Sequence, residues 1–596
     1  MVALNTFNNK AALTKTAVAA AEASTSADFM PVETKVTLAA RGVVATVKND
    51  PTATTTLTAT ADSTVPLASA LSVKTKISTT LNLSNVRVGG LSSDARIAMT
   101  GDVQAAVINA NGGNTGSQQP NYNMQLAAMR YGYLASGAEI SRMNQLGVRQ
   151  WLSSQLATSG TVMDFGQGVV SYDERLRYFH DLETRSGGLQ DDRYQELRNL
   201  WINDGIQYYN QLCNTQRPFL HRYVQFLMNH FSISFGISDT DRVAIKMALQ
   251  AHSYFAHIMA SGVTGKFKDL LNVTARFPAM LLSLSGQYSE SGWNALENYP
   301  RELMELHTVG PLDDNGQQTY TQTDVRAMAR LLTGMRYHTD KNTSPDSRGR
   351  IGGRYYFDST KHDPGAKNFP FLGINMAAYP AAEGDQKITE ILNALGSHPL
   401  TARKFARKLV AHFVSDDPNW APGVAMATRI ANVFMSTDGD LMAVARQLIT
   451  DLNALHPSQA KAPRPDQILI GMVRAGGLVV NTDPAYTNLL RNIMLNYLPA
   501  MNMPHWQAPD VRGFLVDNAR WVNDASIMVI LDHVSMLANQ VSAKIPALRF
   551  YNNTIGAMAS STFMRSSSAQ IANFAATEPV NAIICTMMSK EFLKNI

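Results

Sequence analysis

The chain has 596 residues, of which 45% are hydrophobic and 17% charged, and its formal net charge is +5 at pH 7. This composition excludes wholesale disorder and predicts a globular protein of several domains, because a chain of this kind buries a sizeable core. The charge is mild, and no run of Lys and Arg is interleaved with aromatic residues, so we expect no nucleic-acid partner.

Cysteine content and hydropathy set further bounds. Cys213 and Cys585 are the two cysteines, which excludes a disulfide framework and a cysteine-based zinc or iron–sulfur site and leaves one long-range bridge open. No stretch reaches about 18 uninterrupted apolar residues, so we expect no transmembrane span. Residues 1–24 lack the continuous apolar core of a signal peptide. The sequence therefore neither shows nor excludes export.

The N-terminal part differs in composition from everything that follows. After an N-terminal arm (residues 1–31), residues 32–108 are rich in Thr, Val, Ala and Ser and nearly free of aromatic residues. Between Leu71 and Leu83 every second residue is apolar or β-branched, the period of a strand with one buried face. Weaker alternations occur at 32–38, 43–47, 57–61 and 95–99. Residues 32–108 thus predict a small β-sandwich-like module, with a flexible Thr/Ala-rich tail as the alternative.

A linker rich in Gly, Asn and Gln (residues 109–123) leads into a helical region. Ser136 and Glu139 have the spacing of a capping box, and Gly147 ends that helix. Further helical segments are predicted at 148–156, 173–183, 191–209, 219–230, 239–259, 300–310, 321–334, 386–395, 401–414, 423–435, 441–452, 466–475 and 524–537, with one short strand at 354–357. We therefore predict a mainly α fold: a large multi-helix body over residues 124–596, preceded by the small β-sandwich-like module.

The stretch from Glu297 to Gly334 holds the densest set of potentially reactive side chains. It predicts a helix that begins at Pro300 and ends at Gly310, and a second helix that ends at Gly334. Within the first helix, the spacing predicts that Arg301 and Glu305, four residues apart, pair on one face.

A catalytic centre is the sharper hypothesis for this region. Its candidate residues are Glu302, Glu305, His307, His362, Asp363 and Lys367. Carboxylates and imidazoles brought together bind a divalent metal or exchange protons, and a neighbouring Lys holds an anion. The candidate metal ligands are Glu305, His307, His362 and His230. The alternative is that the carboxylates form ion pairs and cap helices, with the imidazoles hydrogen-bonded in the core.

No catalytic signature supports the sharper hypothesis, because the chain has no HExxH, Walker loop, GxSxG or GxGxxG motif in a suitable context. The sequence requires no cofactor and leaves a divalent metal open. A second charged pattern comprises Arg403, Lys404, Arg407 and Lys408, opposite the apolar side of their helix. We expect it to form a solvated or salt-bridged face rather than an anion-binding surface.

Eight stretches carry a family resemblance. They are QLGVRQWLSSQL, FLMNHFSIS, GKFKDLLNVTARFPAMLLSLSG, ENYPRELMELHTVG with YTQTDVRAMARLLTG, RYYFDSTKHDPGAKNFPFLG, HPLTARKFARKLVAHFVSDDP, APDVRGFLVDNARWVNDAS and SKEFLKN. In this order, over about residues 124–595, the chain resembles the bacterial domain of unknown function 1800 family. The resemblance implies a mostly helical fold, a cell-envelope or extracellular location and no assigned activity. The sequence itself leaves a cytoplasmic location open.

The chain also departs from the family pattern. Phe277 stands where members tend to have His, and residues 283–286 (Ser-Leu-Ser-Gly) stand where they tend to have Tyr-Leu-Asp-Asn. These departures reduce a polar cluster and weaken the catalytic hypothesis, so whether the protein is an enzyme stays open.

Two functions remain. The favoured one is a structural or assembly protein of a bacterial surface or extracellular complex that self-associates through the β module, because exposed strand edges pair readily between chains. Its partners are then further copies of the chain or other protein subunits. The alternative is a metal-assisted hydrolase or oxidoreductase acting on an extracellular polymer.

Overall fold

A computed structural model provides the structure of the protein. It describes residues 33–38, 43–49, 55–61, 127–156, 175, 192–235, 247, 250–256, 258, 264–292, 294–338, 347, 350, 353–451, 453–455, 461–476, 484–542 and 578–588. The chain divides into two compact units, Met1–Pro120 and Asn121–Ile596. Each unit is described by itself.

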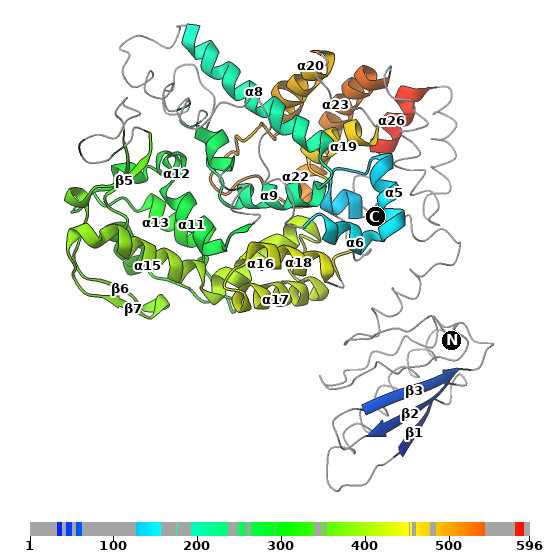
Figure 1. The fold of residues 1–596 in the computed structure, drawn as a ribbon, viewed down its shortest axis with the longest axis horizontal. Helices are drawn as coiled ribbons and strands as arrows, with labels where there is room; N and C mark the ends of the chain where they lie inside the picture. The colour runs from blue at the N-terminus through cyan, green and yellow to red at the C-terminus, as the bar shows by residue number, and fades with distance from the viewer. Residues whose placement is uncertain are drawn as a thin grey trace. The chain divides into compact units, whose positions relative to one another are not determined.

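In the first unit the structure describes three strands: β1 (Glu33–Leu38), β2 (Val43–Asn49) and β3 (Thr55–Ala61). They pair antiparallel in the order β1-β2-β3 (Figure 1). The strand predicted at Leu71–Leu83 lies outside the described residues, as do the arm and the linker. The β-sandwich-like module, which needs a second packed sheet, therefore stays a prediction.

The second unit is mainly helical, which confirms the predicted class for this part of the chain (Figure 1). Its α-helices are α5 (Gly137–Leu146), α6 (Val148–Ser154), α8 (Asp192–Asn214), α9 (Pro218–His230), α11 (Phe267–Arg276), α12 (Pro278–Ser283), α13 (Asn298–Glu302), α14 (Gln322–Leu331), α15 (Gly384–Gly396), α16 (Pro399–Phe413), α17 (Ala421–Ser436), α18 (Leu441–Thr450), α19 (Pro465–Ala475), α20 (Pro484–Asn492), α21 (Leu498–Ala500), α22 (Asn518–Trp521), α23 (Asp524–Ser542) and α26 (Pro579–Met587).

Shorter elements connect these helices. Two segments are π-helical turns, η2 (Leu303–His307) and η6 (Ile493–Tyr497), and the 3₁₀ turns are η1 (Gly286–Tyr288), η3 (Ser359–Lys361), η4 (Pro370–Leu372) and η5 (Ala381–Glu383). Two small antiparallel sheets pair β4 (Met335–Tyr337) with β5 (Tyr355–Phe357) and β6 (Lys367–Phe369) with β7 (Ile374–Met376). The strand predicted at 354–357 is thus one edge of a two-stranded sheet.

The local signals for helix ends are confirmed where they can be followed. Ser136 and Glu139 form the predicted capping box at the start of α5, and Gly147 ends that helix with a φ of 78°. Thr321 and Asp324 form a second capping box at the start of α14. These side chains accept hydrogen bonds from backbone N–H groups that have no partner within the helix.

The helix predicted over 300–310 takes a different form. α13 is followed directly by the π-helical turn η2, and the Thr308 hydroxyl donates to the Leu303 carbonyl over 2.8 Å. Arg301 pairs with Glu297 at 3.0 Å, four residues before it, instead of the predicted Glu305. The prediction failed because it assumed 3.6 residues per turn through a segment that is π-helical.

Several helices were not predicted from the sequence. They include α11, α12, α20 and α26. α12 begins with Pro278 directly after α11, so a single apolar pattern hides two helices with a break between them. The helix predicted at 173–183 and most of the one at 239–259 lie outside the described residues.

Aromatic rings join the central helices of the second unit. Phe405 of α16 lies 5.2 Å from Phe226 of α9 and 5.1 Å from Phe267 of α11, measured between ring centroids. Phe267 in turn lies 5.4 Å from Phe434 of α17. All four rings are buried, and burying each stabilises the fold by roughly 1.5–3 kcal/mol. This core fixes α9 against α16, and both carry candidate site residues.

Two sequence expectations concern the whole body. Both cysteines are free thiols, Cys213 buried and Cys585 exposed. Within the part of the chain that the structure describes, none of the helices combines the length and the hydropathy that a membrane span requires.

Candidate functional site

The predicted site residues fall into two groups, and the first gathers around Asp363. We call it the Asp363 network: Arg330, Thr333, His362, Asp363, Lys367 and Tyr379. Arg330 comes from α14, Lys367 begins β6, and Tyr379 follows β7. Gly334 lets the chain turn beside this network, because its φ is +86° and an added Cβ would lie 2.7 Å from the Asp358 carbonyl.

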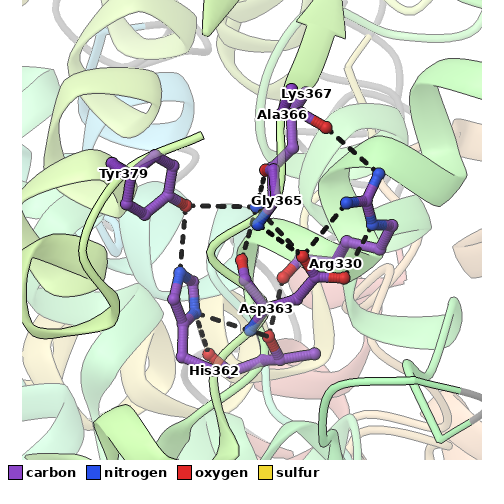
Figure 2. A network of polar contacts seen from close by, with 8 residues as sticks. Arg330, His362, Asp363, Gly365, Ala366, Lys367 and Tyr379 are labelled. Carbon is purple, nitrogen blue, oxygen red and sulfur yellow. Dashed lines mark hydrogen bonds and ion pairs between the residues drawn. The ribbon is translucent and has the colours of Figure 1, made fainter. Parts of the chain in front are cut away.

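Asp363 is the anionic centre of this network (Figure 2). Its carboxylate accepts two hydrogen bonds from the Arg330 guanidinium, over 2.7 and 3.0 Å, and one from the Gly365 N–H over 2.9 Å. Partial burial raises the pKa of Asp363, but these hydrogen bonds and the nearby charge of Lys367 outweigh it and lower the pKa to about 2. Asp363 is therefore a stable carboxylate at neutral pH.

Lys367 is buried within the network, with its side chain 0% exposed. Its ammonium donates to the Asp363 carbonyl, to the Gly365 carbonyl over 2.8 Å and to the Tyr379 hydroxyl over 3.2 Å. An ammonium has three donors, so all three are used. Burial lowers the pKa of Lys367 to about 8, against the opposing charge of Asp363.

A chain of hydrogen bonds continues from Lys367 to His362. The Tyr379 hydroxyl lies 2.9 Å from His362 Nε2, and His362 Nδ1 lies 2.8 Å from the Thr333 carbonyl. Because a carbonyl can only accept, His362 carries its proton on Nδ1 and accepts from Tyr379 at Nε2. Burial lowers the pKa of His362, which keeps the ring neutral.

The second group lies where α9 and α16 meet the turn η2. We call it the lysine cluster: His230, His307, Lys404 and Lys408. Lys404 donates to the Glu305 carbonyl, and Lys408 donates to the Leu306 carbonyl over 3.0 Å. His230 Nε2 donates to the His307 carbonyl over 3.1 Å. Three side chains thus bind the last carbonyls of a helix, where partial negative charge favours cations.

Among the described residues, no carboxylate forms an ion pair with Lys404 or Lys408 of the lysine cluster. Burial, followed by the charge of Lys408, lowers the pKa of Lys404 to about 7, and burial lowers that of Lys408 to about 8. Burial also lowers the pKa of His307 to about 3, and its Nε2 has no hydrogen-bond partner among the described residues. Both imidazoles are therefore neutral in the folded protein.

The basic pattern on α16 divides between two environments. Arg403 and Arg407 are exposed and bind the Asp314 carboxylate over 2.9 and 2.8 Å, which confirms a salt-bridged face for these two residues. Lys404 and Lys408 point into the lysine cluster instead. For them the predicted solvated or salt-bridged face is wrong, because residues one position further along a helix lie on a different side of it.

The remaining candidates lie outside both groups of side-chain contacts. Glu302 and Glu305 are half-buried, and burial followed by the Glu305 charge raises the pKa of Glu302. No group of three or more His, Cys, Asp or Glu side chains among the described residues is arranged to hold a metal ion. The predicted ligands are instead divided: His230 and His307 lie in the lysine cluster and His362 lies in the Asp363 network.

Arg330, Thr333 and Tyr379 are not among the site residues that the sequence predicts, although each contacts one of them. Arg330 lies in the stretch YTQTDVRAMARLLTG, where its position on the polar side of α14 was the available signal. At the departures from the family pattern, Phe277 packs 5.2 Å from the Tyr254 ring, and the Ser283 hydroxyl accepts from the Ser234 N–H over 3.0 Å.

Comparison with known proteins identifies a family. A family model described as "Protein of unknown function (DUF1800)" matches residues 126–594. No curated protein and no solved structure matches the chain.

Proposed function

The chain belongs to the DUF1800 family of proteins of unknown function, and from its side-chain contacts we propose that it is a structural or assembly protein of a bacterial surface or extracellular complex. In this proposal the helical body is a rigid scaffold, and the Thr/Val-rich N-terminal segment joins copies of the chain by strand pairing. Its partners are further copies or other protein subunits.

The observation that carries the proposal is how the buried charges are used. The Lys367 ammonium directs two of its three hydrogen bonds to the carbonyls of Asp363 and Gly365, and the Asp363 carboxylate accepts from the Gly365 N–H. Lys404 and Lys408 bind carbonyls of η2 in the same way. These charged side chains hold backbone turns in place, which is the role expected in a scaffold.

The second support comes from the N-terminal segment. Its residues alternate with the period of a strand, and β-branched residues dominate, so exposed edges of such strands pair readily between chains. The resemblance of the body to a family whose members are commonly exported supports the part of the proposal that puts the assembly at the cell surface or outside the cell.

Light scattering tests this proposal. Removing residues 1–120 should leave a folded body with a smaller oligomer mass, because the pairing segment is gone. The same oligomer before and after the deletion would contradict the proposal.

A pair of full-length variants sharpens the test. Thr58→Pro removes a donor from β3, whereas Thr115→Pro makes the same change in the linker. We expect the first to reduce the oligomer mass and the second to leave it unchanged. Equal behaviour of the two variants would mean that strand pairing does not join the copies.

A second candidate function rests on one observation. Lys367, Tyr379 and His362 form a continuous hydrogen-bonded chain, and the lowered pKa of Lys367, about 8, suits proton exchange near neutral pH. This chain favours the alternative of a hydrolase or oxidoreductase acting on an extracellular polymer. Its metal-assisted version predicts stoichiometric metal in the purified protein and altered behaviour of a Glu305→Ala, His362→Ala double variant. Absence of both results would exclude that version.

A further inference from the structure

A third buried polar group lies away from both groups described above. We call it the arginine cluster: Arg222 and Gln225 of α9, His412 of α16, and Arg464 with Asp466 at the start of α19. Each of these side chains is buried, with exposures of 2% for Arg222 and His412 and 6% for Arg464. The cluster belongs to neither function considered so far.

Asp466 is the one carboxylate of this cluster, and its oxygens are already used. It accepts from Arg464 Nε and Nη2 over 3.3 and 3.2 Å and from the Gln225 amide over 3.0 Å. Asp466 is 1% exposed, so its charge acts in a poorly solvated environment. It compensates one of the two arginines.

Among the described residues no carboxylate contacts Arg222 directly, and the charge of Asp466 acts on it only from a distance. Its Nη1 donates to the Gln225 amide oxygen over 3.2 Å, and its guanidinium lies 5.9 and 5.7 Å from the ring centroids of Tyr133 and Phe413. It makes no ion pair with any residue that the structure describes. A buried guanidinium held by an amide and two ring faces keeps most of its charge uncompensated.

Three side chains of the arginine cluster carry unused polar atoms. Arg222 Nε, Arg464 Nη1 and both ring nitrogens of His412 are buried and have no hydrogen-bond partner within the described part of the chain. Burial followed by the charges of Arg222, Arg464 and Lys461 lowers the pKa of His412, so the ring stays neutral with one donor and one acceptor. The cluster therefore has three unused donors, one each from Arg222, Arg464 and His412. With two arginines and one aspartate, it also carries a net positive charge.

From these contacts we infer that Arg222, Arg464 and His412 form a buried binding site for an oxyanion, a carboxylate or phosphate group. An oxyanion supplies the acceptors that Arg222 Nε and Arg464 Nη1 lack, and it supplies the negative charge that Arg222 lacks. A water molecule would satisfy hydrogen bonds and leave that charge uncompensated. His412 contributes a neutral N–H, which adds a donor without adding charge.

Titrating the full-length protein with acetate or with inorganic phosphate, at constant ionic strength, shows whether the site binds a carboxylate or a phosphate group. Calorimetry should show saturable binding of at least one of them near one site per chain. The midpoint of thermal unfolding should then rise by about 1 °C for each tenfold increase in that anion above its dissociation constant. Absence of saturable binding of either anion would overturn the inference.

Variants connect the binding to the arginine cluster. Arg222→Met should weaken the affinity for the anion at least tenfold. His412→Leu should have the same effect and can be used for the test if Arg222→Met does not fold. The control Arg491→Met removes an exposed arginine of α20 and should leave the affinity within twofold of the unchanged protein. Equal affinity in Arg222→Met, His412→Leu and the control would show that the anion binds elsewhere and would overturn the inference.

Discussion

The Asp363 network and the lysine cluster each hold lysine ammonium groups away from bulk water, Lys367 buried and Lys404 and Lys408 half-buried, and they do so in different ways. Lys367 meets a carboxylate at 3.6 Å and fills its three donors, whereas Lys404 and Lys408 meet helix carbonyls and a neutral imidazole. The first arrangement compensates charge with charge. The second relies on partial charges, which are weaker, so we expect its residues to contribute less to stability and to respond more to pH.

The largest expected effect comes from removing the carboxylate of the first group. Asp363→Ala leaves Arg330 and Lys367 without their anion and should lower the free energy of unfolding by about 3 kcal/mol. Denaturant unfolding measures the change. Asp314→Ala is the control, because Asp314 also binds two cations but at the surface, where the loss should stay within about 1 kcal/mol. Equal losses would contradict the contrast between the buried and the exposed group.

The next prediction compares the buried Lys367 with the half-buried Lys404 directly. Lys367→Met leaves the carbonyls of Asp363 and Gly365 without the lysine donor and removes the cation 3.6 Å from the Asp363 carboxylate, and it should cost about 2 kcal/mol. Lys404→Met leaves one carbonyl and removes a poorly compensated charge, so it should cost about 1 kcal/mol or less. The free energies of unfolding of the two variants test this order. The reverse order would show that the helix carbonyls compensate charge better than Asp363 does.

The pH dependence of stability should separate the groups further. The pKa of Lys404 is about 7 in the folded chain and 10.5 as its ordinary value, so the folded state binds fewer protons between these pH values. Stability should therefore rise with pH through this window, by about 2 kcal/mol from pH 7 to 9 for this residue. Lys404→Met should flatten the rise in unfolding experiments at successive pH values. An unchanged slope would contradict the assignment.

Asp363 acts in the opposite pH range. Its folded pKa of about 2 lies below the ordinary value of 3.8, so its stabilising contribution is present above pH 3.8 and is lost as the pH falls toward 2. The Asp363→Ala variant should not lose this stability between pH 3.8 and 2, and its stability should still rise with pH above pH 7. If this variant lacked both the acid loss and the alkaline rise in stability, the Asp363 network and the lysine cluster would not be independent.

The smallest effect is expected for Tyr379, which links Lys367 to His362. Tyr379→Phe keeps the ring beneath the ammonium, 4.9 Å away, and removes only the hydroxyl. The loss should be about 1 kcal/mol, the ordinary value of a hydrogen bond. A loss as large as that of Asp363→Ala would show that the hydroxyl, rather than the carboxylate, holds this network together.

The predictions from the sequence succeeded where the signal was local. The capping box at Ser136 and the stop at Gly147 depend on residues within one helical turn, so their spacing alone identifies them. The pairing predicted for Arg301 and Glu305 failed because the π-helical turn changes which side chains share a face. The residue types between Leu303 and His307 do not predict a π-helical turn.

The candidate site was predicted in part. The sequence identified His362, Asp363 and Lys367 by type and proximity, and the structure brings them together. Their partner Arg330 lies 33 residues before Asp363, and no spacing rule connects residues that far apart. Likewise, which two of the four basic residues on α16 are buried depends on the position of η2 beside that helix.

The capping box and stop of α5, the mainly helical class and the family are therefore properties that the sequence determined by itself, because they depend on local spacing and on eight ordered stretches. The fate of the charged side chains was decided by the tertiary structure. Whether a lysine is solvated, paired or buried depends on which carbonyls and carboxylates other segments bring within 3 Å, as for Lys367 and Lys404. A buried charge such as that of Arg222 becomes visible only when every possible partner has been placed.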